Sequence, residues 1–311
     1  MSQTFNRYFS KIKRWTFAFG LLTLLSGVVL AQGWEQTYGS LANETARDLS
    51  PTADGGWLLL GHSNSFGAGD RDIYLVKTDV NGQEDWSTNL PITQSDELAA
   101  AFEASGNGNY LIAGTQLVAN QSYLYLLEVD AMGQSLWSVR SEEDSLQCRA
   151  LSILPDGGAA LVGVQQSYVD DGNGNLIFEG DFYIWRTDDQ GNTLWTQSYG
   201  GPAYDEAYDC HAKDDGSLLV LGNTQSFGAG GFDIWLLQLD GNGELMWDKT
   251  YGGPFADLAY ALEPTADGGY LITGRKNELT GTEEDIYLLK IDAEGEEQWS
   301  QTIPIPACQS A

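Results

Sequence analysis

Two glycine-rich stretches of this chain have the composition of a phosphate-binding loop. The sequence SFGAGDRDIYLVKTD at 65–79 returns as SFGAGGFDIWLLQLD at 226–240. A phosphate-binding loop stands before a helix N-terminus and usually contains a Lys that reaches the phosphates. An apolar, strand-like run follows both loops instead, and neither loop contains a Lys. Both loops are therefore predicted to connect strands rather than to bind phosphate.

A longer connection in the middle of the chain carries oxygen ligands at alternate positions. In YVDDGNGNLIFEGD at 168–181, Asp171, Asn173 and Asn175 follow the spacing of a calcium loop. Leu176 stands where the EF-hand pattern has Gly, and no Glu stands at the twelfth position. The segment has two interpretations, a calcium site and a hydrophilic hairpin with an Asn-Gly turn, and these departures favour the hairpin. The sequence suggests no other metal or cofactor.

A unit repeated five times positions these segments. The pattern D-x-x-G-x-x-x-W begins at Asp79, Asp130, Asp188, Asp240 and Asp292 and ends at Trp86, Trp137, Trp195, Trp247 and Trp299. These tryptophans are 51 to 58 residues apart, and Trp34 stands 52 residues ahead of the first of them. A fixed period of this length is the sequence signature of a repeat architecture.

Each period divides into four short runs with the composition of strands. In the last period the runs are 258–264, 270–274, 285–291 and 297–303. Tyr, Trp, Ile, Leu and Val dominate the runs, while Gly, Asp and Asn bound them. Four antiparallel strands in a period of roughly 50 residues are typical of propeller blades. The chain is thus predicted to be all-β, with a single β-propeller domain at 32–311 made of about five four-stranded blades.

Two sequence features resemble known propellers. D-x-x-G-x-x-x-W is similar to the tryptophan-docking motif of quinoprotein-like propellers, although it is one residue shorter between Asp and Gly. The full unit GGYLITG…DIYLLKIDAEGEEQW resembles the generic propeller repeat of secreted bacterial proteins. The resemblance covers nearly all of 33–303. It implies the fold and not a reaction, because such proteins share an architecture rather than a chemistry.

The first 31 residues have the features of a secretory signal peptide. Basic residues, the last of them Arg14, precede an apolar run at 15–31 that ends in Val29 and Ala31. The run of 17 residues is short for a membrane span, and no basic cluster follows it. The sequence predicts an exported protein outside the cell or on its surface, with the periplasm as an alternative. No transmembrane segment is expected once the signal peptide is removed.

Charge and cysteine content limit the partners of the remaining chain. Removing 1–31 leaves 11 basic and 44 acidic residues, a net charge of −33. This excess opposes binding to nucleic acid and suits a soluble protein, which we expect to be a monomer.

Cys148 falls at a repeat position otherwise occupied by Ala, and Cys210 at one occupied by Leu or Phe. Both are predicted to fill the core and to form no disulfide with each other.

Carboxylates recur at the start of the third run in four repeats, at Asp72, Asp181, Asp233 and Asp285. One interpretation is a ring of carboxylates that holds cations. The other is that each Asp accepts hydrogen bonds from the backbone of its own loop. Recurrence in four repeats favours the second interpretation, because each repeat has the same local loop to stabilise.

Ligand-binding residues are expected on one of the two faces of the propeller. Alternate connections emerge on opposite faces, and the short turns DGG and D-x-x-G share one of them. The other, the variable-loop face, carries the longer loops and the links between blades, where binding usually resides. The candidates there are Tyr168, Phe178, Tyr204, Asp205, Glu206, Phe255 and Asp257.

The candidate residues are compatible with two classes of function. The first is a secreted, non-enzymatic propeller that acts as a binding, adhesion or protein-interaction scaffold, with a glycan or a protein as its ligand. The alternative is a secreted carbohydrate-active or quinoprotein-like enzyme that uses acidic residues of the same face. An anionic quinone would need basic groups around it, and only 11 Lys and Arg lie outside the signal peptide. The sequence therefore favours binding over catalysis.

Overall fold

The computed structural model describes residues 34–41, 43–65, 71–90, 95–170, 174–277 and 285–304. These residues form twenty β-strands and no helix. The strands make five separate sheets of four antiparallel strands, and within each sheet every strand pairs with its neighbour in the chain. Short turns produce this pattern, because they join strands that then lie side by side. The predicted signal peptide and the third cysteine of the chain, Cys308, lie outside the described residues.

Each sheet is one blade of four consecutive strands. Blade 1 contains β1 (Glu44–Pro51), β2 (Trp57–Ser63), β3 (Asp72–Thr78) and β4 (Glu84–Leu90). Blade 2 contains β5 (Asp96–Ala104), β6 (Tyr110–Val118), β7 (Gln121–Val129) and β8 (Ser135–Arg140). Blade 3 contains β9 (Leu146–Ile153), β10 (Ala159–Asp170), β11 (Leu176–Thr187) and β12 (Thr193–Tyr199). Blade 4 contains β13 (Asp205–Ala212), β14 (Leu218–Thr224), β15 (Asp233–Leu239) and β16 (Leu245–Tyr251). Blade 5 contains β17 (Asp257–Pro264), β18 (Tyr270–Lys276), β19 (Asp285–Ile291) and β20 (Glu297–Ile303).

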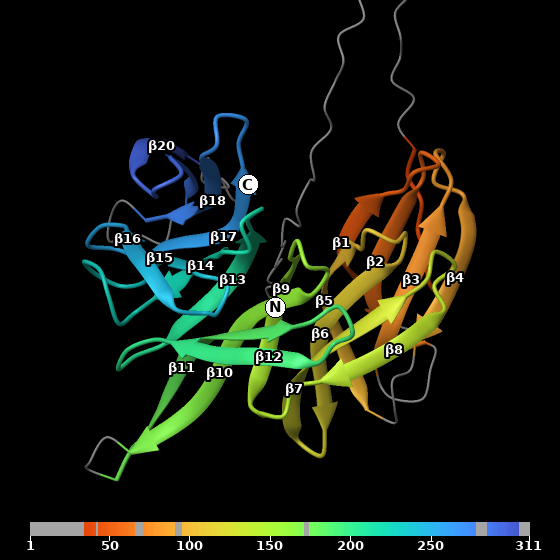
Figure 1. The fold of residues 1–311 in the computed structure, drawn as a ribbon, viewed down its shortest axis with the longest axis horizontal. Coiled ribbons are helices and arrows are strands. Elements are labelled where there is room, and N and C mark those ends of the chain that lie inside the picture. Colours follow the sequence, from red (N-terminus) through yellow and green to blue (C-terminus); the bar gives the residue numbers. More distant parts are fainter. Residues whose placement is uncertain are drawn as a thin grey trace, which may run out of the picture.

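The blades succeed one another around a common centre, from blade 1 in orange to blade 5 in blue (Figure 1). The first strands of neighbouring blades contact each other, β1 with β5, β5 with β9, β9 with β13 and β13 with β17. The first strand is therefore the innermost strand of each blade, and the fourth is the outermost. This arrangement confirms the prediction of an all-β propeller with five four-stranded blades.

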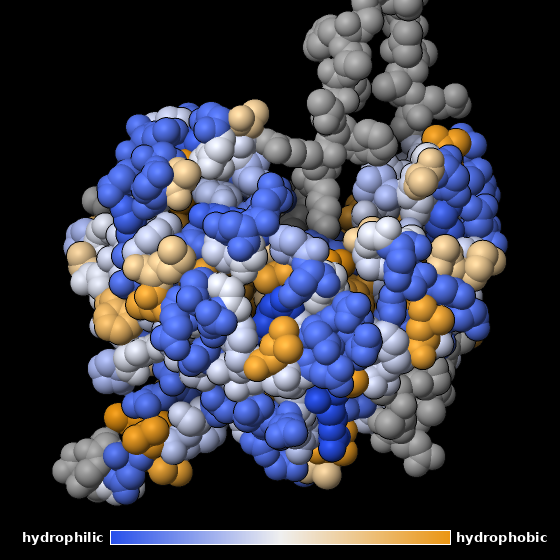
Figure 2. Space-filling view, viewed as in Figure 1, coloured by the Kyte–Doolittle hydropathy of each residue, from blue (hydrophilic) through white to orange (hydrophobic). Residues whose placement is uncertain are grey.

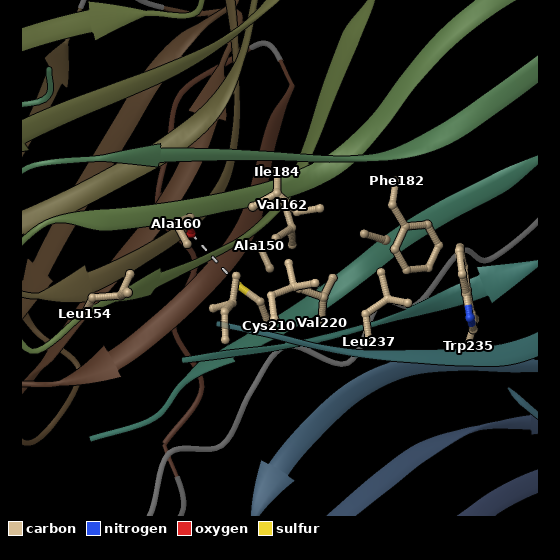
Figure 3. Close-up of a cluster of buried hydrophobic side chains, with 13 residues drawn as sticks. Ala150, Leu154, Ala160, Val162, Phe182, Ile184, Cys210, Val220, Trp235 and Leu237 are labelled. Carbon is tan, nitrogen blue, oxygen red and sulfur yellow. Dashed lines mark hydrogen bonds between the residues drawn. The ribbon is translucent and has the colours of Figure 1, made fainter. Parts of the chain in front are cut away.

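Four apolar clusters lie between neighbouring blades and hold them together. Figure 3 shows the cluster between blades 3 and 4, in which the ring centroids of Phe182 and Trp235 are 4.8 Å apart. Cys210 lies in the same cluster, and Cys148 lies between blades 2 and 3. Both thiols are buried and free, and burial raises the pKa of Cys148 to about 12. The prediction that they fill the core without pairing is confirmed.

The Asp of each D-x-x-G turn organises the backbone that follows it. In blade 3, Oδ1 of Asp188 accepts the N–H groups of Gln190 and Asn192, at 2.9 and 2.8 Å. The same pair of hydrogen bonds is made by Asp79, Asp130, Asp240 and Asp292. Because these bonds hold the turn in its conformation, the repeat keeps Asp at this position.

The tryptophan of the outermost strand in blades 1 to 4 packs on the turn of the next blade. In blade 3 the turn glycine Gly191 has a φ of 82°, and a Cβ there would lie 2.8 Å from the indole of Trp137 in blade 2. The equivalent pairs are Trp86 with Gly133, Trp195 with Gly243 and Trp247 with Gly295. The tryptophans thus link neighbouring blades at their outer edges, which is a structural role.

Trp34 makes the same contact from outside the five sheets. Its indole lies against Gly82 of blade 1, and the hydroxyl of Tyr38 donates to the Gly82 carbonyl oxygen over 2.6 Å. Residues 34–40 belong to no strand. At the other end of the repeats, Trp299 is 46 % exposed. The described chain therefore consists of five complete blades and one additional copy of an outer-strand segment.

Candidate functional site

The largest insertion in the repeats forms a long hairpin on the variable-loop face. β10 and β11 have 12 residues each, whereas the corresponding strands of blade 4 have seven. Their register pairs Tyr168 with Phe178 and Val169 with Ile177. The predicted hairpin is confirmed. We call its outer part, residues 166–170 and 174–180, the arm; it points to the lower left of Figure 1.

The calcium interpretation of this segment stays a prediction. Asp171 and Asn173 lie outside the described residues, and Asn175 stands directly before β11. Asp170 accepts the N–H of Gly174 across the tip over 3.1 Å. Within the described ranges, no three or more His, Cys, Asp or Glu side chains are grouped so that they could hold a metal ion.

Next to its tip, the two strands of the arm expose apolar side chains on both faces of the hairpin. Tyr168 is 69 % exposed and Leu176 is 70 % exposed. Val169, Ile177 and Phe178 are exposed beside them, and Figure 2 shows the hydrophobic colour at the end of the arm. The strands of the arm are therefore less hydrophilic than expected, whereas Asp171 and Asn173 of the expected turn lie outside the described residues. Apolar side chains that gather on the surface of a protein are typical of an interaction site.

Three of the predicted ligand-binding residues meet along the arm. The ring centroids of Tyr168 and Phe178 are 5.3 Å apart. Phe178 in turn stacks on Tyr204, with 5.5 Å between centroids and 25° between planes. Tyr204 belongs to the link between blades 3 and 4 and forms a parallel bridge with Gly180 of the arm. The insertion and the link thus share one aromatic surface, held by the stacking that aromatic rings prefer.

Glu206 connects this aromatic surface to the innermost strands. Its buried carboxylate accepts the hydroxyls of Tyr204 and Tyr208, at 3.2 and 3.0 Å. It also forms an ion pair with Arg149, whose Nε lies 2.6 Å from Oε1. Burial and the charge of Glu206 raise the pKa of Tyr204 to about 12 and also raise the pKa of Tyr208. Both hydroxyls therefore stay protonated at neutral pH and act as donors.

A β-bulge interrupts every innermost strand at the same place. The extra residues are Arg47, Ala100, Arg149, Tyr208 and Tyr260. A bulge bends its strand and re-aims the side chain of the extra residue. In blade 4 it brings the backbones so close that a Cβ on Gly222 would lie 2.2 Å from the Glu206 carbonyl oxygen. The glycine of the second strand is therefore required by the bulge.

The bulged residues of blades 3 to 5 form a continuous row of stacked side chains. The guanidinium of Arg149 lies 5.7 Å from the ring centroid of Tyr208, a distance at which cation-π attraction operates. Tyr208 and Tyr260 meet edge to face at 5.4 Å, and Arg275 of β18 lies 5.8 Å over the Tyr260 ring. Together with the arm and Glu206 they form one surface, which we call the ladder: Tyr168, Phe178, Tyr204, Glu206, Arg149, Tyr208, Tyr260 and Arg275.

Sequence reasoning missed four members of the ladder, Arg149, Tyr208, Tyr260 and Arg275. A signal for the first three exists in the alignment of the repeats. Each follows the Ala or Cys of the innermost strand, and this next position holds Arg, Ala or Tyr depending on the repeat. A position that varies within a regular repeat is released from the packing that fixes its neighbours. Arg275 has no comparable signal, because its role depends on a contact with the neighbouring strand.

The remaining candidates take other positions. Asp205 and Asp257 are buried at the starts of β13 and β17. Their carboxylates accept the N–H groups of Gly201 and Gly253 in the preceding links, at 2.8 and 2.7 Å, which gives both a structural role. Phe255 is half-buried, and in the part of the chain that the structure describes no ring contact joins it to the ladder. A role for these three in ligand binding stays a prediction.

The second glycine-rich loop, at 226–231, is a connector as predicted. The carboxylate of Asp233 at the start of β15 accepts the N–H of Ala229 in this loop over 2.7 Å. The N–H of Ser226 donates to Asp205 at the start of β13 in the same blade. The structural interpretation of the recurring Asp is therefore confirmed at this position. In the first glycine-rich loop, residues 66–70 lie outside the described residues.

The opposite face of the propeller contains a shallow hollow of about 240 Å³. It is lined by Arg186 of β11 and by short-turn residues of blades 3 and 4, namely Leu154, Pro155, Asp156, Asp214, Asp215, Gly216 and Gly241. Arg186 is already paired with Asp156 and donates to the Thr187 carbonyl oxygen. None of the residues predicted to bind a ligand lies there, and we assign the hollow no function.

The burial of His62 beside two arginines predicts a pH dependence of stability. The side chain is buried, and burial together with Arg47 and Arg71 lowers the pKa of His62 to about 4. An unfolded His titrates near pH 6.5, so the folded state gains stability above that pH and loses it as the pH falls towards about 4. We expect a loss of about 1–2 kcal/mol from this residue over that range. Replacing His62 by Gln should flatten this slope in urea denaturation curves, and an unchanged slope would contradict the assignment.

Comparisons with known proteins show no family. No protein-family profile matches this sequence, and no curated protein matches it. Solved structures with a similar arrangement include the Pan2 WD40 domain of Neurospora crassa, at 14 % identity and a TM-score of 0.48, covering 84 % of this chain and 64 % of that one. The β-propeller domain of the Trilobed protease of Pyrococcus furiosus has 14 % identity and a TM-score of 0.44, covering 86 % of this chain and 72 % of that one. An acylaminoacyl peptidase of Pyrococcus horikoshii has 11 % identity and a TM-score of 0.47, covering 82 % of this chain.

These likenesses do not extend beyond the fold. This chain spans 64 % of the Pan2 domain chain and 39 % of the peptidase. One fold can host many unrelated functions, so the function has to be argued from the site. In the described ranges no helix has the length and apolar character that crossing a membrane requires.

Proposed function

We propose that this protein is an exported, non-enzymatic binding scaffold that recognises a glycan with the ladder. The observation that carries the proposal is the composition of this surface. Five aromatic rings lie in contact with one carboxylate and two guanidinium groups along a single row. Aromatic rings stack on the apolar faces of sugar rings, while a few fixed polar groups between them bind the hydroxyls and set the orientation.

The hydrogen bonding of Glu206 supports binding rather than hydrolysis. Glycoside hydrolysis requires two carboxyl groups that flank one bond, about 5–9.5 Å apart. Glu206 is the one carboxylate of the ladder, and it already accepts bonds from Arg149, Tyr204 and Tyr208. A carboxylate held by three donors is an orienting group and not a free base.

The net charge of the surrounding chain favours a neutral glycan. Arg149 is compensated by Glu206 within the same surface. The surrounding chain is strongly acidic, with a net charge of −33 outside the predicted signal peptide. A long polyanion would be repelled by this field, whereas the binding of a neutral polyol does not depend on it.

A glycan array followed by calorimetry with the best oligosaccharide tests the proposal. We expect binding that is lost by tenfold or more in Tyr204→Ala and in Tyr208→Ala, because each removes a ring of the ladder and a donor to Glu206. The matched control is Tyr123→Ala, which removes a tyrosine at the start of the third strand of blade 2, outside the ladder. Carrying out the array with calcium and with a chelator also tests the calcium interpretation of the arm.

Two results would count against the proposal. One is an array without a bound glycan, and the other is equal affinity in the wild type and both ladder variants.

Export rests on the predicted signal peptide at 1–31. N-terminal sequencing of the protein recovered from the medium is expected to begin at Gln32, and recovery of the intact N-terminus from the cytoplasm would refute export.

The exposed aliphatic residues on the strands of the arm support a protein ligand as the second candidate. Val169, Leu176 and Ile177 are exposed, and aliphatic side chains offer no stacking face to a sugar. Replacing these three residues by Ser leaves the ladder intact. If the variant still binds the glycan but no longer binds a protein partner of the wild type, the ladder and these aliphatic residues bind different ligands.

A further inference from the structure

The four internal junctions between blades follow one pattern. One blade contributes apolar residues of its second and third strands, which we call its outgoing face. The next blade contributes an incoming face from its own first three strands. Between blades 4 and 5 the outgoing face is Leu219, Leu221, Ile234 and Leu236, and the incoming face includes Ala259, Leu262, Ile272, Tyr287 and Leu289. Burial of such faces is what stabilises a propeller, because one sheet cannot cover itself.

The outgoing face of blade 5 has no such cover in the described structure. Ile286 is 44 % exposed. The residues at the same repeat position in the other four blades, Ile73, Leu124, Phe182 and Ile234, are 0 % exposed. Ile303 of β20 and Trp299 beside it are also exposed, at 39 % and 46 %. Blade 5 therefore presents to solvent the apolar face that every other blade buries.

The incoming face of blade 1 is exposed to solvent in the same way. Leu49 is 45 % exposed. Its counterparts in the following blades, Phe102, Leu151, Cys210 and Leu262, are between 0 % and 3 % exposed. Figure 1 shows blades 1 and 5 at the two ends of the row of blades, separated from each other. The molecule thus carries both halves of a junction, and the two halves do not meet.

Residues 34–40 show what kind of element belongs between these faces. Trp34 lies against Gly82, and the Tyr38 hydroxyl donates to the Gly82 carbonyl oxygen. In blade 4, Trp247 lies against Gly295 and Tyr251 donates to the Gly295 carbonyl oxygen at the same 2.6 Å. Residues 34–38 therefore dock on blade 1 as the outermost strand of a preceding blade does. The other three strands of that blade are not among the described strands, all of which belong to complete sheets.

We propose that a three-stranded antiparallel sheet of a partner polypeptide fills the place between blade 5 and blade 1, and that residues 34–40 add its outermost strand. The partner sheet presents aliphatic and aromatic residues to Ile286, as blade 5 does to blade 4. It carries a turn with a glycine at positive φ, which receives Trp299. Its free edge pairs with residues 34–40, which is recognition by addition of a β-strand.

The occupied position at Gly82 selects this partner over two others. Blade 5 could close directly on blade 1, or a second copy of the chain could dock there. Either would bring a complete four-stranded blade whose own Trp299 has to lie on Gly82. Trp34 already takes that position. Only a sheet without an outermost strand avoids the conflict.

The test uses the full chain with a cleavable partner sheet. A copy of residues 257–296 is attached behind residue 311 through a protease-sensitive linker. This copy contains β17 to β19 and a D-x-x-G turn, but it has no outermost strand. Because the copy folds while attached, poor folding of the isolated peptide cannot obscure the result. We expect the copy to co-elute with the chain after the linker is cut, and the fluorescence of Trp299 to shift to the blue.

Substitutions in the two bare faces complete the test. Ile286→Asp and, separately, Leu49→Asp are expected to weaken retention of the cleaved copy by tenfold or more. The control Leu136→Asp changes a residue of blade 2 that is 51 % exposed and lies at neither face, and it should leave retention unchanged. Release of the copy after cleavage would overturn the proposal. A buried Trp299 in the unmodified protein would also overturn it, since blade 5 would then close on blade 1 directly.

Discussion

Replacing Phe182 by Ala is expected to lower the free energy of unfolding by about 3–5 kcal/mol. Phe182 is 0 % exposed and packs on Trp235 with 4.8 Å between centroids, in the cluster between blades 3 and 4. Removing the ring loses its transfer free energy and leaves a cavity that two paired sheets cannot close. Guanidinium denaturation followed by tryptophan fluorescence measures the effect.

The matched control for this substitution is Ile286→Ala in blade 5. Ile286 occupies the same repeat position as Phe182 but is 44 % exposed. Its truncation is expected to cost less than about 1 kcal/mol, because little apolar area leaves a buried environment. A loss comparable to that of the other junctions would mean that the outgoing face of blade 5 is covered in the protein alone.

Replacing Glu206 by Ala is expected to have the second largest effect, on both stability and ligand binding. The substitution leaves the Arg149 guanidinium and the hydroxyls of Tyr204 and Tyr208 without their common acceptor. In this hydrogen-bonded pair only the Arg149 side chain, which is 31 % exposed, reaches solvent. Breaking the pair is therefore expected to lower the free energy of unfolding by about 2–3 kcal/mol. Affinity for the glycan should fall by tenfold or more, because the polar centre of the ladder is lost.

Glu206→Gln separates charge from hydrogen bonding. The amide oxygen still accepts a bond from a tyrosine hydroxyl, while the ion pair with Arg149 is lost. We therefore expect an intermediate stability and a measurable affinity, determined by denaturation and calorimetry on the same preparations. A Glu206→Ala variant as stable as the wild type would show that the carboxylate does not organise the ladder.

The sequence by itself determined the fold of this protein. Because the repeat returns Asp, Gly and Trp at fixed spacing, it predicts the turns, the four strands per blade and the number of complete blades. These features depend on interactions within one blade or at one fixed contact, such as that of Trp137 with Gly191. The burial of Cys148 and Cys210 followed from the same alignment, because apolar residues stand at their positions in the other repeats.

The candidate site was predicted only in part. Tyr168, Phe178, Tyr204 and Glu206 were identified because they lie in the insertion and in a variable link, two features visible in the sequence. Arg149, Tyr208 and Tyr260 come from three different blades, and their contacts arise from bulges that place them side by side. Spacing along the chain contains no information about such neighbours, which are 52 or more residues apart.

The tertiary structure alone decided how the apolar surface is distributed. The alternation of residues in β19 is the same as in β15, and the sequence gives no sign that Ile286 differs from Ile234. One is 44 % exposed and the other 0 %, because burial of a blade face depends on a neighbouring sheet and not on the strand that carries it. The repeat fixes each blade through local hydrogen bonds and alternation, whereas the cover of its faces is a property of the assembled ring.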